Sequence, residues 1–157
     1  MELVILRLLF MLGLVLLFFS LRKPPLKEWL LCYLLAAYFG TFLGDLAAKH
    51  ELISYPVKLF TQFQSSVLYE YLLLPLLSIY FYRNTYRSSM GAVIGRAAVS
   101  SSVLTIIEVF LEHQTNYVHY ITWEWYYSLI SLFLFFVFVW LMMELLNYLA
   151  GEKQEVE

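Results

Sequence analysis

Ionisable side chains interrupt several of the most apolar segments of this chain. Asp45, Glu70 and Glu108 each lie about one helical turn inside the end of an apolar run, and Arg7 lies similarly within a fourth run. An ionised side chain in hydrocarbon is costly unless it is paired or hydrated, so such positions face the protein interior or a water-filled cavity. Carboxylates that share such a site hold a proton or a cation between them. The chemistry that these residues predict is therefore proton or cation binding.

The composition indicates a membrane protein. Of the 157 residues, 62% are hydrophobic and 14% are charged, and the mean hydropathy is +0.72. A soluble domain of this length does not need so much apolar surface, because its core saturates while its exterior stays wet. The ten Lys and Arg residues form no basic block. We therefore expect one domain, over residues 1–150, whose partner is a lipid bilayer and not a nucleic acid.

The expected fold is all-α, a bundle of five transmembrane helices. A spanning helix needs about 20 residues. The third apolar run is the shortest and contains Pro75, which a membrane helix tolerates when neighbours satisfy the carbonyl that the proline frees. The five expected spans cover residues 3–21, 29–48, 67–82, 90–111 and 125–149.

Two further segments complete the expected organisation. Residues 55–66 are too polar to span a membrane, but they place apolar side chains at spacings of three to four, with Pro56 suited to a first helical position. This pattern predicts a short amphipathic helix at the membrane interface. Residues 151–157 form an acidic tail that we expect to be disordered.

The basic residues predict an orientation. Six of them fall in connections on one side of the expected bundle and two on the other. Because Lys and Arg concentrate in cytoplasmic connections, the N-terminus is expected outside and the C-terminus in the cytoplasm. The six are Arg22, Lys23, Lys27, Arg83, Arg87 and Lys153, and the two are Lys49 and Lys58.

With this orientation, each of the five helices carries one charge near its outer end. Arg7, Asp45, Glu70 and Glu108 lie about 5 Å inside the outer ends of helices one to four, from the helical rise per residue, and Glu124 begins the fifth helix. Four carboxylates and one Arg cannot all be buried and ionised, so this layer would hold protons, bind a cation or open to water. A second interpretation stays open, in which these are ordinary interfacial residues that reach the lipid headgroups.

Nearer the cytoplasmic side, Arg96 and Glu144 lie about 10 Å within the fourth and fifth helices, where they would form a structural ion pair. Small residues follow one face of the fourth helix, and small faces allow close backbone approach. The fourth helix is therefore expected at the centre of the bundle. That small face consists of Gly91, Gly95, Ala98 and Ser102.

Catalytic and metal-binding motifs are missing from the sequence. Glu108, Glu112, His113, His119 and Glu124 offer oxygen and nitrogen ligands, but no His-x3-His motif or Cys pair accompanies them. The chain also has no Gly-rich phosphate loop, no G-x-S-x-G and no HExxH. We therefore expect no metal, no cofactor and no enzymatic activity.

Several short motifs follow one another along the chain: Tyr55-Pro56-Val57-Lys58-Leu59-Phe60, then Tyr69-Glu70-Tyr71 with Pro75, then Glu108, then Thr115-x4-Tyr120-x2-Trp123-x-Trp125. In order and spacing this series resembles an uncharacterised family of small multipass membrane proteins of endospore-forming bacteria, of the Bacillus and Clostridium type. The match extends over about residues 26–134, and it departs where Glu70 replaces a favoured Asp and Tyr117 a favoured Leu. The resemblance implies a bacterial membrane protein, in the cell membrane or a spore membrane, and implies no activity. It points to Tyr55, Pro56, Glu70, Glu108, Tyr120 and Trp123.

Two classes of function compete. The first is a structural or partner-binding membrane component, in which the polar layer specifies helix packing and the chain contacts a second copy or another membrane protein. The alternative is a proton- or cation-handling channel or transporter component. In this alternative Glu70 and Glu108 bind, Asp45 and Glu124 tune them, and Arg7 is the counter-charge. The small enclosed volume of such a short chain favours the first class.

Overall fold

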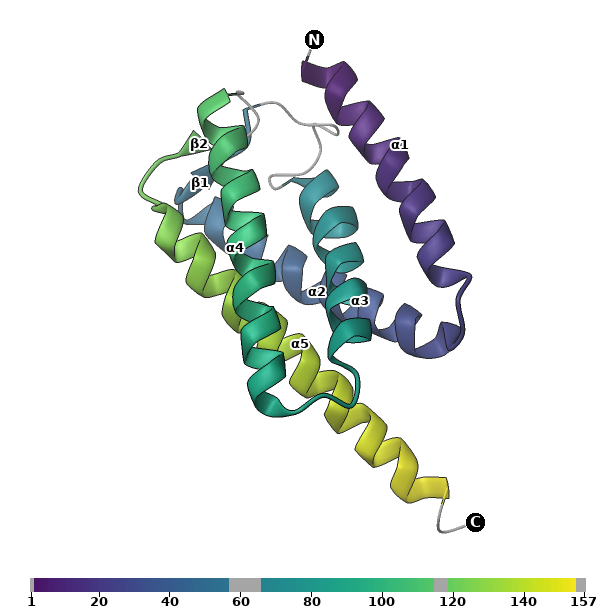
Figure 1. Ribbon diagram of the computed structural model, residues 1–157. Helices are drawn as coiled ribbons and strands as arrows, with labels where there is room; N and C mark the ends of the chain where they lie inside the picture. Colours follow the sequence, from purple (N-terminus) through teal and green to yellow (C-terminus); the bar gives the residue numbers. More distant parts are fainter. Residues whose placement is uncertain (1, 57–65, 115–118, 155–157) are drawn as a thin grey trace.

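The computed structural model describes residues 2–56, 66–114 and 119–154, and this part of the chain is almost entirely helical (Figure 1). A short π-helix, η1, precedes the third α-helix, and two short strands pair with each other. The elements are α1 (Glu2–Leu21), α2 (Leu26–Lys49), β1 (Ile53–Ser54), η1 (Leu68–Leu73), α3 (Leu74–Thr85), α4 (Met90–Gln114), β2 (His119–Tyr120) and α5 (Trp125–Gln154). The all-α class is therefore confirmed.

Three of the described helices are long and apolar enough to cross a membrane. They contain the stretches Leu26–Lys49, Met90–His113 and Trp125–Gly151, and α1 adds a shorter apolar stretch, Arg7–Leu21. Large apolar side chains also cover the outside of the bundle, as at Leu8, Val99 and Ile106, which are each about two-thirds exposed. Such an exterior is unusual in water and suits hydrocarbon.

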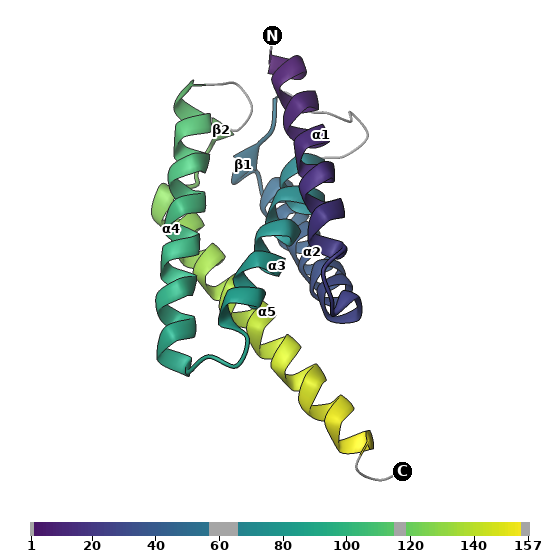
Figure 2. The same cartoon turned by 45° about the vertical axis from the view of Figure 1, so that its right-hand side comes forward.

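The helix α3, together with η1, lies at the centre of the bundle. This pair contacts α1, α2, α4 and α5, whereas α4 packs mainly against α5 and α3 (Figures 1 and 2). Buried side chains of α3, such as Ile79, Phe81 and Tyr82, belong to the same core as Phe136 and Val139 of α5. The core thus surrounds the third helix.

The prediction that the fourth helix is central is wrong. Its small residues Gly91, Gly95, Ala98 and Ser102 are all exposed, and an added Cβ at either glycine would meet no heavy atom within 4 Å. The close helix approach occurs instead on α2, where Ala36, Gly40 and Gly44 recur every four residues. An added Cβ at Gly40 would lie 2.9 Å from the Leu74 side chain. Small residues on α2, not on α4, therefore let the central helix approach closely.

The two ends of the bundle differ in character. At one end β1 and β2 pair antiparallel, with Ile53 opposite Tyr120, and the Leu52 carbonyl accepts a hydrogen bond from the Ile121 main-chain N–H at 3.1 Å. We call this the ribbon end. The other end, the turn end, carries the α1–α2 and α3–α4 turns at residues 22–25 and 86–89, and Figure 2 shows the two ends well separated.

Several predicted boundaries differ in detail from those of the structure. The second helix begins at Leu26 instead of residue 29, and α5 continues to Gln154, so it includes the first residues of the tail that was expected to be disordered. Residues 155–157 lie outside the described part. Of the expected interfacial helix, residues 57–65 also lie outside it, while Tyr55, Pro56 and Ser66 at its ends are not helical.

Candidate functional site

A cavity with a volume of 330 Å³ lies near the ribbon end, and we call it the carboxylate cavity. Residues of α2, the β1 segment, η1, α3, α4, the segment after β2 and α5 line it, so segments far apart in the sequence meet there. Most of its wall is hydrocarbon, contributed by Leu43, Leu46, Leu52, Leu74, Leu132 and Phe135. A cavity of this size is within the range of small-molecule sites.

Two carboxylates face this apolar cavity. Glu70 of η1 is 2% exposed and Glu108 of α4 is 8% exposed, and both line the cavity. Of the described residues in its wall, none is Lys or Arg, and His50 is the only other residue apart from tyrosines that ionises. The cavity wall is therefore acidic, with two carboxylates from different helices.

The position of Glu70 depends on the absence of a side chain at Gly44. An added Cβ at Gly44 would overlap the Glu70 carboxyl group, and it would lie 3.1 Å from the second carboxyl oxygen, Oε2. Because the Glu70 carboxyl group would have to move away from an added Cβ, glycine at this position of α2 is a condition for the observed placement of Glu70. The Gly40-x3-Gly44 spacing on α2 thus shapes the site as well as the helix contact.

The π-helix η1, which carries Glu70, has defined hydrogen bonds at both of its ends. Ser66 begins it, since the Ser66 hydroxyl accepts from the Tyr69 N–H at 3.2 Å and the Ser66 carbonyl accepts from the Glu70 N–H at 2.9 Å. At its end, the Leu74 N–H donates to the Tyr69 carbonyl five residues earlier, the π-helical pattern. Single π-turns inserted before α-helices recur at functional sites, where they re-aim side chains.

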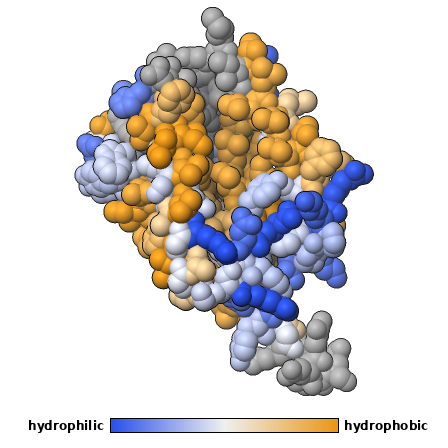
Figure 3. All heavy atoms as spheres, in the orientation of Figure 1, coloured by the Kyte–Doolittle hydropathy of each residue, from blue (hydrophilic) through white to orange (hydrophobic). Residues whose placement is uncertain are grey.

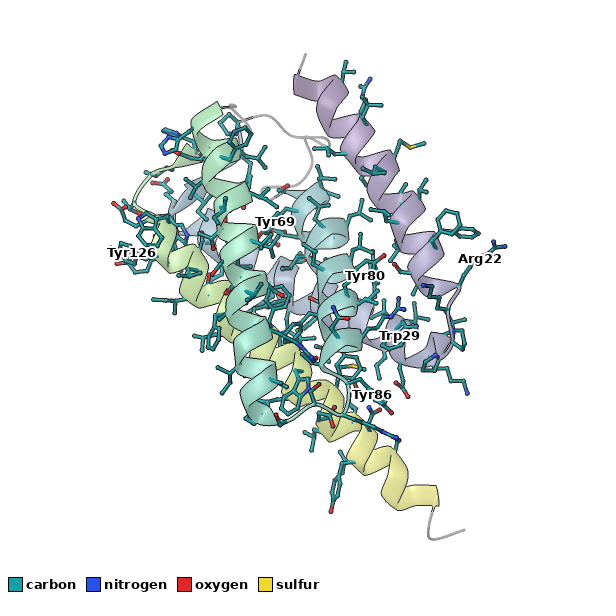
Figure 4. All side chains as sticks on the ribbon, in the orientation of Figure 1. Arg22, Trp29, Tyr69, Tyr80, Tyr86 and Tyr126 are labelled. Atoms are coloured by element: carbon teal, nitrogen blue, oxygen red, sulfur yellow. The ribbon has the colours of Figure 1, made fainter. Side chains whose placement is uncertain are left out.

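Aromatic and hydroxyl groups complete the wall. Tyr55, Tyr69 and Trp123 contribute rings, and Figure 4 shows Tyr69 between η1 and α4. The Trp123 indole N–H donates to the Ser128 hydroxyl at 2.8 Å, which ties the segment after β2 to the start of α5. This hydrogen bond holds the Trp123 ring at the cavity. The electron-rich faces of such rings attract cations.

The structure brings together part of the predicted layer of charges. Glu70 and Glu108 share the cavity, whereas Asp45, Glu124 and Arg7 do not line it. Asp45 is half-buried, and both Glu124 and Arg7 are exposed. Asp45 follows Gly44 on α2, and one residue of an α-helix turns the side chain by about 100° away from that face. Charged residues at the same predicted depth in the membrane therefore do not all lie on the side of their helix that lines the cavity.

The residues that carry the family resemblance concentrate at the same place. Tyr55, Glu70, Glu108 and Trp123 line the cavity, while Pro56 is exposed. Tyr120 belongs to β2, where its main chain is opposite Ile53. The spaced motifs are thus brought to one end of the fold, from four different segments.

Sequence reasoning missed several wall residues. Gly44 could have been found from the Gly40-x3-Gly44 spacing, and Ser128 and Ser131 from their i, i+3 spacing at the start of an apolar helix. Tyr69 had no separate signal, because its role follows from the π-helix.

The predicted ion pair between Arg96 and Glu144 is not formed. The Arg96 guanidinium donates instead to the Asn84 carbonyl and, at 2.8 Å, to the Ser88 hydroxyl. Figures 1 and 2 show α5 slanting away from α4 toward its C-terminal end. The two helices diverge where the pair was expected, so equal distances along the helices do not bring these side chains together.

Among the described residues, no group of three or more His, Cys, Asp or Glu side chains is placed to hold a metal ion. Of the ligands considered from the sequence, Glu112 and His113 are adjacent, with 3.2 Å between the Glu112 Oε2 and the His113 Nδ1. His113 is exposed. That contact is therefore a surface interaction, apart from the cavity.

No family model matches the chain, and no curated protein or solved structure shows significant similarity to it. The resemblance to a membrane-protein family of endospore-forming bacteria stays a prediction.

Proposed function

We propose that this chain is an integral membrane protein that binds a cation in the carboxylate cavity. One observation carries the proposal: Glu70 and Glu108 come from different helices, are almost completely buried, and face the same cavity. Evolution rarely retains buried acids at a membrane position without a use, because each one opposes folding. A cation-binding site needs acidic side chains that line one cavity, as Glu70 and Glu108 do.

Electrostatic repulsion between the two carboxylates is the reason that we propose a cation as the ligand. Two like charges in an apolar site of low dielectric oppose each other's ionisation, so we expect the pair to share at least one proton when no cation is bound. A bound cation replaces that proton, which leaves as the ligand enters. Cation binding and proton release are coupled in this scheme, which joins the two chemistries of proton and cation handling at one site.

The wall favours an organic cation over an inorganic ion. A bare metal ion seeks six or more oxygen ligands, and hydrocarbon side chains dominate this wall. An ammonium group attached to an apolar body would place its charge between the carboxylates and its body against Leu43, Leu74 and Phe135. Aromatic rings at Tyr69 and Trp123 add cation–π attraction.

The proposed topology has five helices crossing the membrane, with the ribbon end outside and the turn end in the cytoplasm. The basic residues Arg22, Lys23, Arg83 and Arg87 at the turn end support this orientation. The carboxylate cavity then belongs to the outer half of a bacterial cell membrane or spore membrane. A cation would enter it from the outer side, past the β1–β2 pairing.

The alternative, a structural or partner-binding component, has weaker support. In that alternative the whole predicted layer of charges would specify helix packing, yet Arg7 is exposed and does not line the cavity. In that alternative Glu70 and Glu108 would affect stability alone.

Binding is tested with the purified chain in lipid nanodiscs, by titration with phenyltrimethylammonium, whose charge is fixed at every pH. We expect a Glu70→Gln, Glu108→Gln double substitution to weaken binding by about tenfold or more, equivalent to about 1.4 kcal/mol. Glu124→Gln is the matched control, since Glu124 is an exposed acid at the same end. Equal binding by all three proteins would refute the cation site, and a change in stability without a change in binding would favour the structural role.

Transport requires a second measurement. Liposomes that contain the protein and an interior pH dye would report proton release during uptake of phenyltrimethylammonium. Proton movement that the double substitution abolishes would indicate exchange of a proton for a cation. Binding without movement would indicate a receptor or store.

A further inference from the structure

The second candidate site involves Arg96 of α4, at the turn end of the bundle. Arg96 lies about 9 Å along the helix from Met90, from the helical rise per residue. Its side chain is exposed, and the neighbouring Ile94 and Val99 are exposed apolar residues. A charged group on a lipid-facing surface must reach toward the headgroups or find an anion.

The direction of its side chain is fixed. The guanidinium donates to the Asn84 carbonyl and to the Ser88 hydroxyl, so it is drawn toward the α3–α4 turn. A guanidinium has five N–H donors, and those left over suit the oxygens of a phosphate. Arg96 is therefore held in place by the protein while it keeps donors for a ligand.

This part of the chain is basic without local compensation. Residues 71–107 contain three Arg and no Asp or Glu. Among the described residues no carboxylate forms an ion pair with Arg96.

A cavity of 350 Å³ adjoins the guanidinium, and we call it the arginine cavity. Asn84, Arg96 and Ser100 give it polar groups, while Phe81 and Val99 give it hydrocarbon. Gly95 keeps it open, because an added Cβ there would meet no heavy atom within 4 Å. The site thus combines a basic end with an apolar wall.

The surface around the site changes from apolar to hydrophilic. Figure 3 shows hydrophilic side chains gathered over the lower part of the molecule, around the α3–α4 and α1–α2 turns, below a largely hydrophobic surface. Aromatic rings lie in this same zone, with Arg83 over Trp29 and Arg87 over Tyr86, and Figure 4 shows Trp29, Tyr80 and Tyr86 there. Such a zone is typical of the level of the lipid headgroups.

We propose that the arginine cavity binds an anionic phospholipid, with its phosphate at Arg96 and Ser88 and an acyl chain against Phe81 and Val99. Charge complementarity selects this occupant, since a guanidinium without a carboxylate in an ion pair, beside a hydrocarbon wall, matches a headgroup joined to a chain. The site is independent of the carboxylate cavity, because it lies at the opposite end and shares no wall residue with it.

Lipid retention is measured by native mass spectrometry of the full chain, released from micelles that contain equal amounts of phosphatidylglycerol and phosphatidylcholine. Wild-type protein is expected to retain phosphatidylglycerol preferentially. Arg96→Gln is expected to reduce this preference by about tenfold, and Arg96→Lys is expected to restore part of it. Arg22→Gln is the matched control, because Arg22 is an exposed base at the same end that stacks on Phe18 and lies outside the cavity.

A second pair of variants tests the cavity without altering charge. Gly95→Phe fills it and is expected to abolish the preference, whereas Gly91→Phe is not, because Gly91 also has open space but does not line the cavity. The proposal fails if Arg96→Gln and Arg22→Gln reduce the preference equally, or if Gly95→Phe leaves it unchanged. It also fails if inorganic phosphate displaces the lipid, since the site would then recognise the anion alone.

Discussion

The Tyr33 hydroxyl donates a 2.6 Å hydrogen bond to the main-chain carbonyl of Tyr71. Tyr71 lies four residues before Pro75, so its carbonyl is the one that an α-helix would satisfy with the N–H that proline lacks. The expectation that a neighbour would satisfy this carbonyl is confirmed. A side chain of α2 thereby stabilises the irregular helix that positions Glu70.

Removing this hydroxyl should destabilise the bundle. We expect Tyr33→Phe to lower the free energy of unfolding by about 0.5–1.5 kcal/mol, because it removes a hydrogen bond that joins α2 to η1. Tyr38→Phe is the control, since Tyr38 is an exposed tyrosine of the same helix. Unfolding in mixed micelles, followed by circular dichroism, gives both values. Equal stabilities would show that the Tyr33 hydrogen bond contributes nothing.

The cost of losing the hydroxyl should depend on Pro75. In Pro75→Ala the new N–H at position 75 can donate to the Tyr71 carbonyl, so Tyr33→Phe should become less costly in that background. A double-mutant cycle is therefore expected to show a coupling of about 0.5 kcal/mol or more. Additive effects would mean that the proline and the tyrosine act on different features of the helix.

A methyl group at position 44 should displace the Glu70 carboxyl group. Since an added Cβ at Gly44 overlaps that carboxyl, Gly44→Ala is expected to cost about 1–3 kcal/mol of stability. It should also weaken phenyltrimethylammonium binding, which titration in nanodiscs would measure. Gly95→Ala is the control for helix propensity, because its Cβ enters open space. If Gly44→Ala binds like wild type, Glu70 does not need its observed position.

Particular residues show what the sequence could reveal. Glu70 and Glu108 were found because burial of an acid in an apolar run is a local signal with few explanations. Arg7, Asp45 and Glu124 gave the same signal but do not line the cavity, since rotation about a helix axis and the packing order of helices are tertiary properties. The predicted ion pair between Arg96 and Glu144 was wrong for the same reason. The positions of two residues along their helices do not reveal whether the helices diverge.

The sequence also predicted where the helices lie along the chain better than it predicted their irregularities and contacts. The helices follow apolar length closely, and Pro75 indicated an irregular third span, but nothing in the sequence predicted its π-turn. The pairing of β1 with β2 could not be foreseen either. It joins loop segments separated by more than sixty residues, and two-residue strands leave no periodic pattern.

The β1 segment forms part of the wall of the carboxylate cavity, and fixing its pairing with β2 should slow ligand exchange. Leu52, Ile53 and Tyr55 from this segment line the cavity, so a ligand entering from the ribbon end must pass it. Ser54 lies directly opposite His119, and such partners in antiparallel strands have Cβ atoms about 5 Å apart. Oxidation of a Ser54→Cys, His119→Cys variant is therefore expected to form a disulfide, while the native Cys32 is buried in α2 and should not interfere.

Stopped-flow exchange of phenyltrimethylammonium is then compared before and after reduction of the disulfide. Slower exchange in the oxidised protein, restored by reductant, would identify the strand pairing as the entrance. Ser54→Cys combined with Ile121→Cys is the register control, because Ile121 lies two residues away from the partner of Ser54. Equal cross-linking of both variants would contradict the observed register, and unchanged exchange after cross-linking would place the entrance elsewhere.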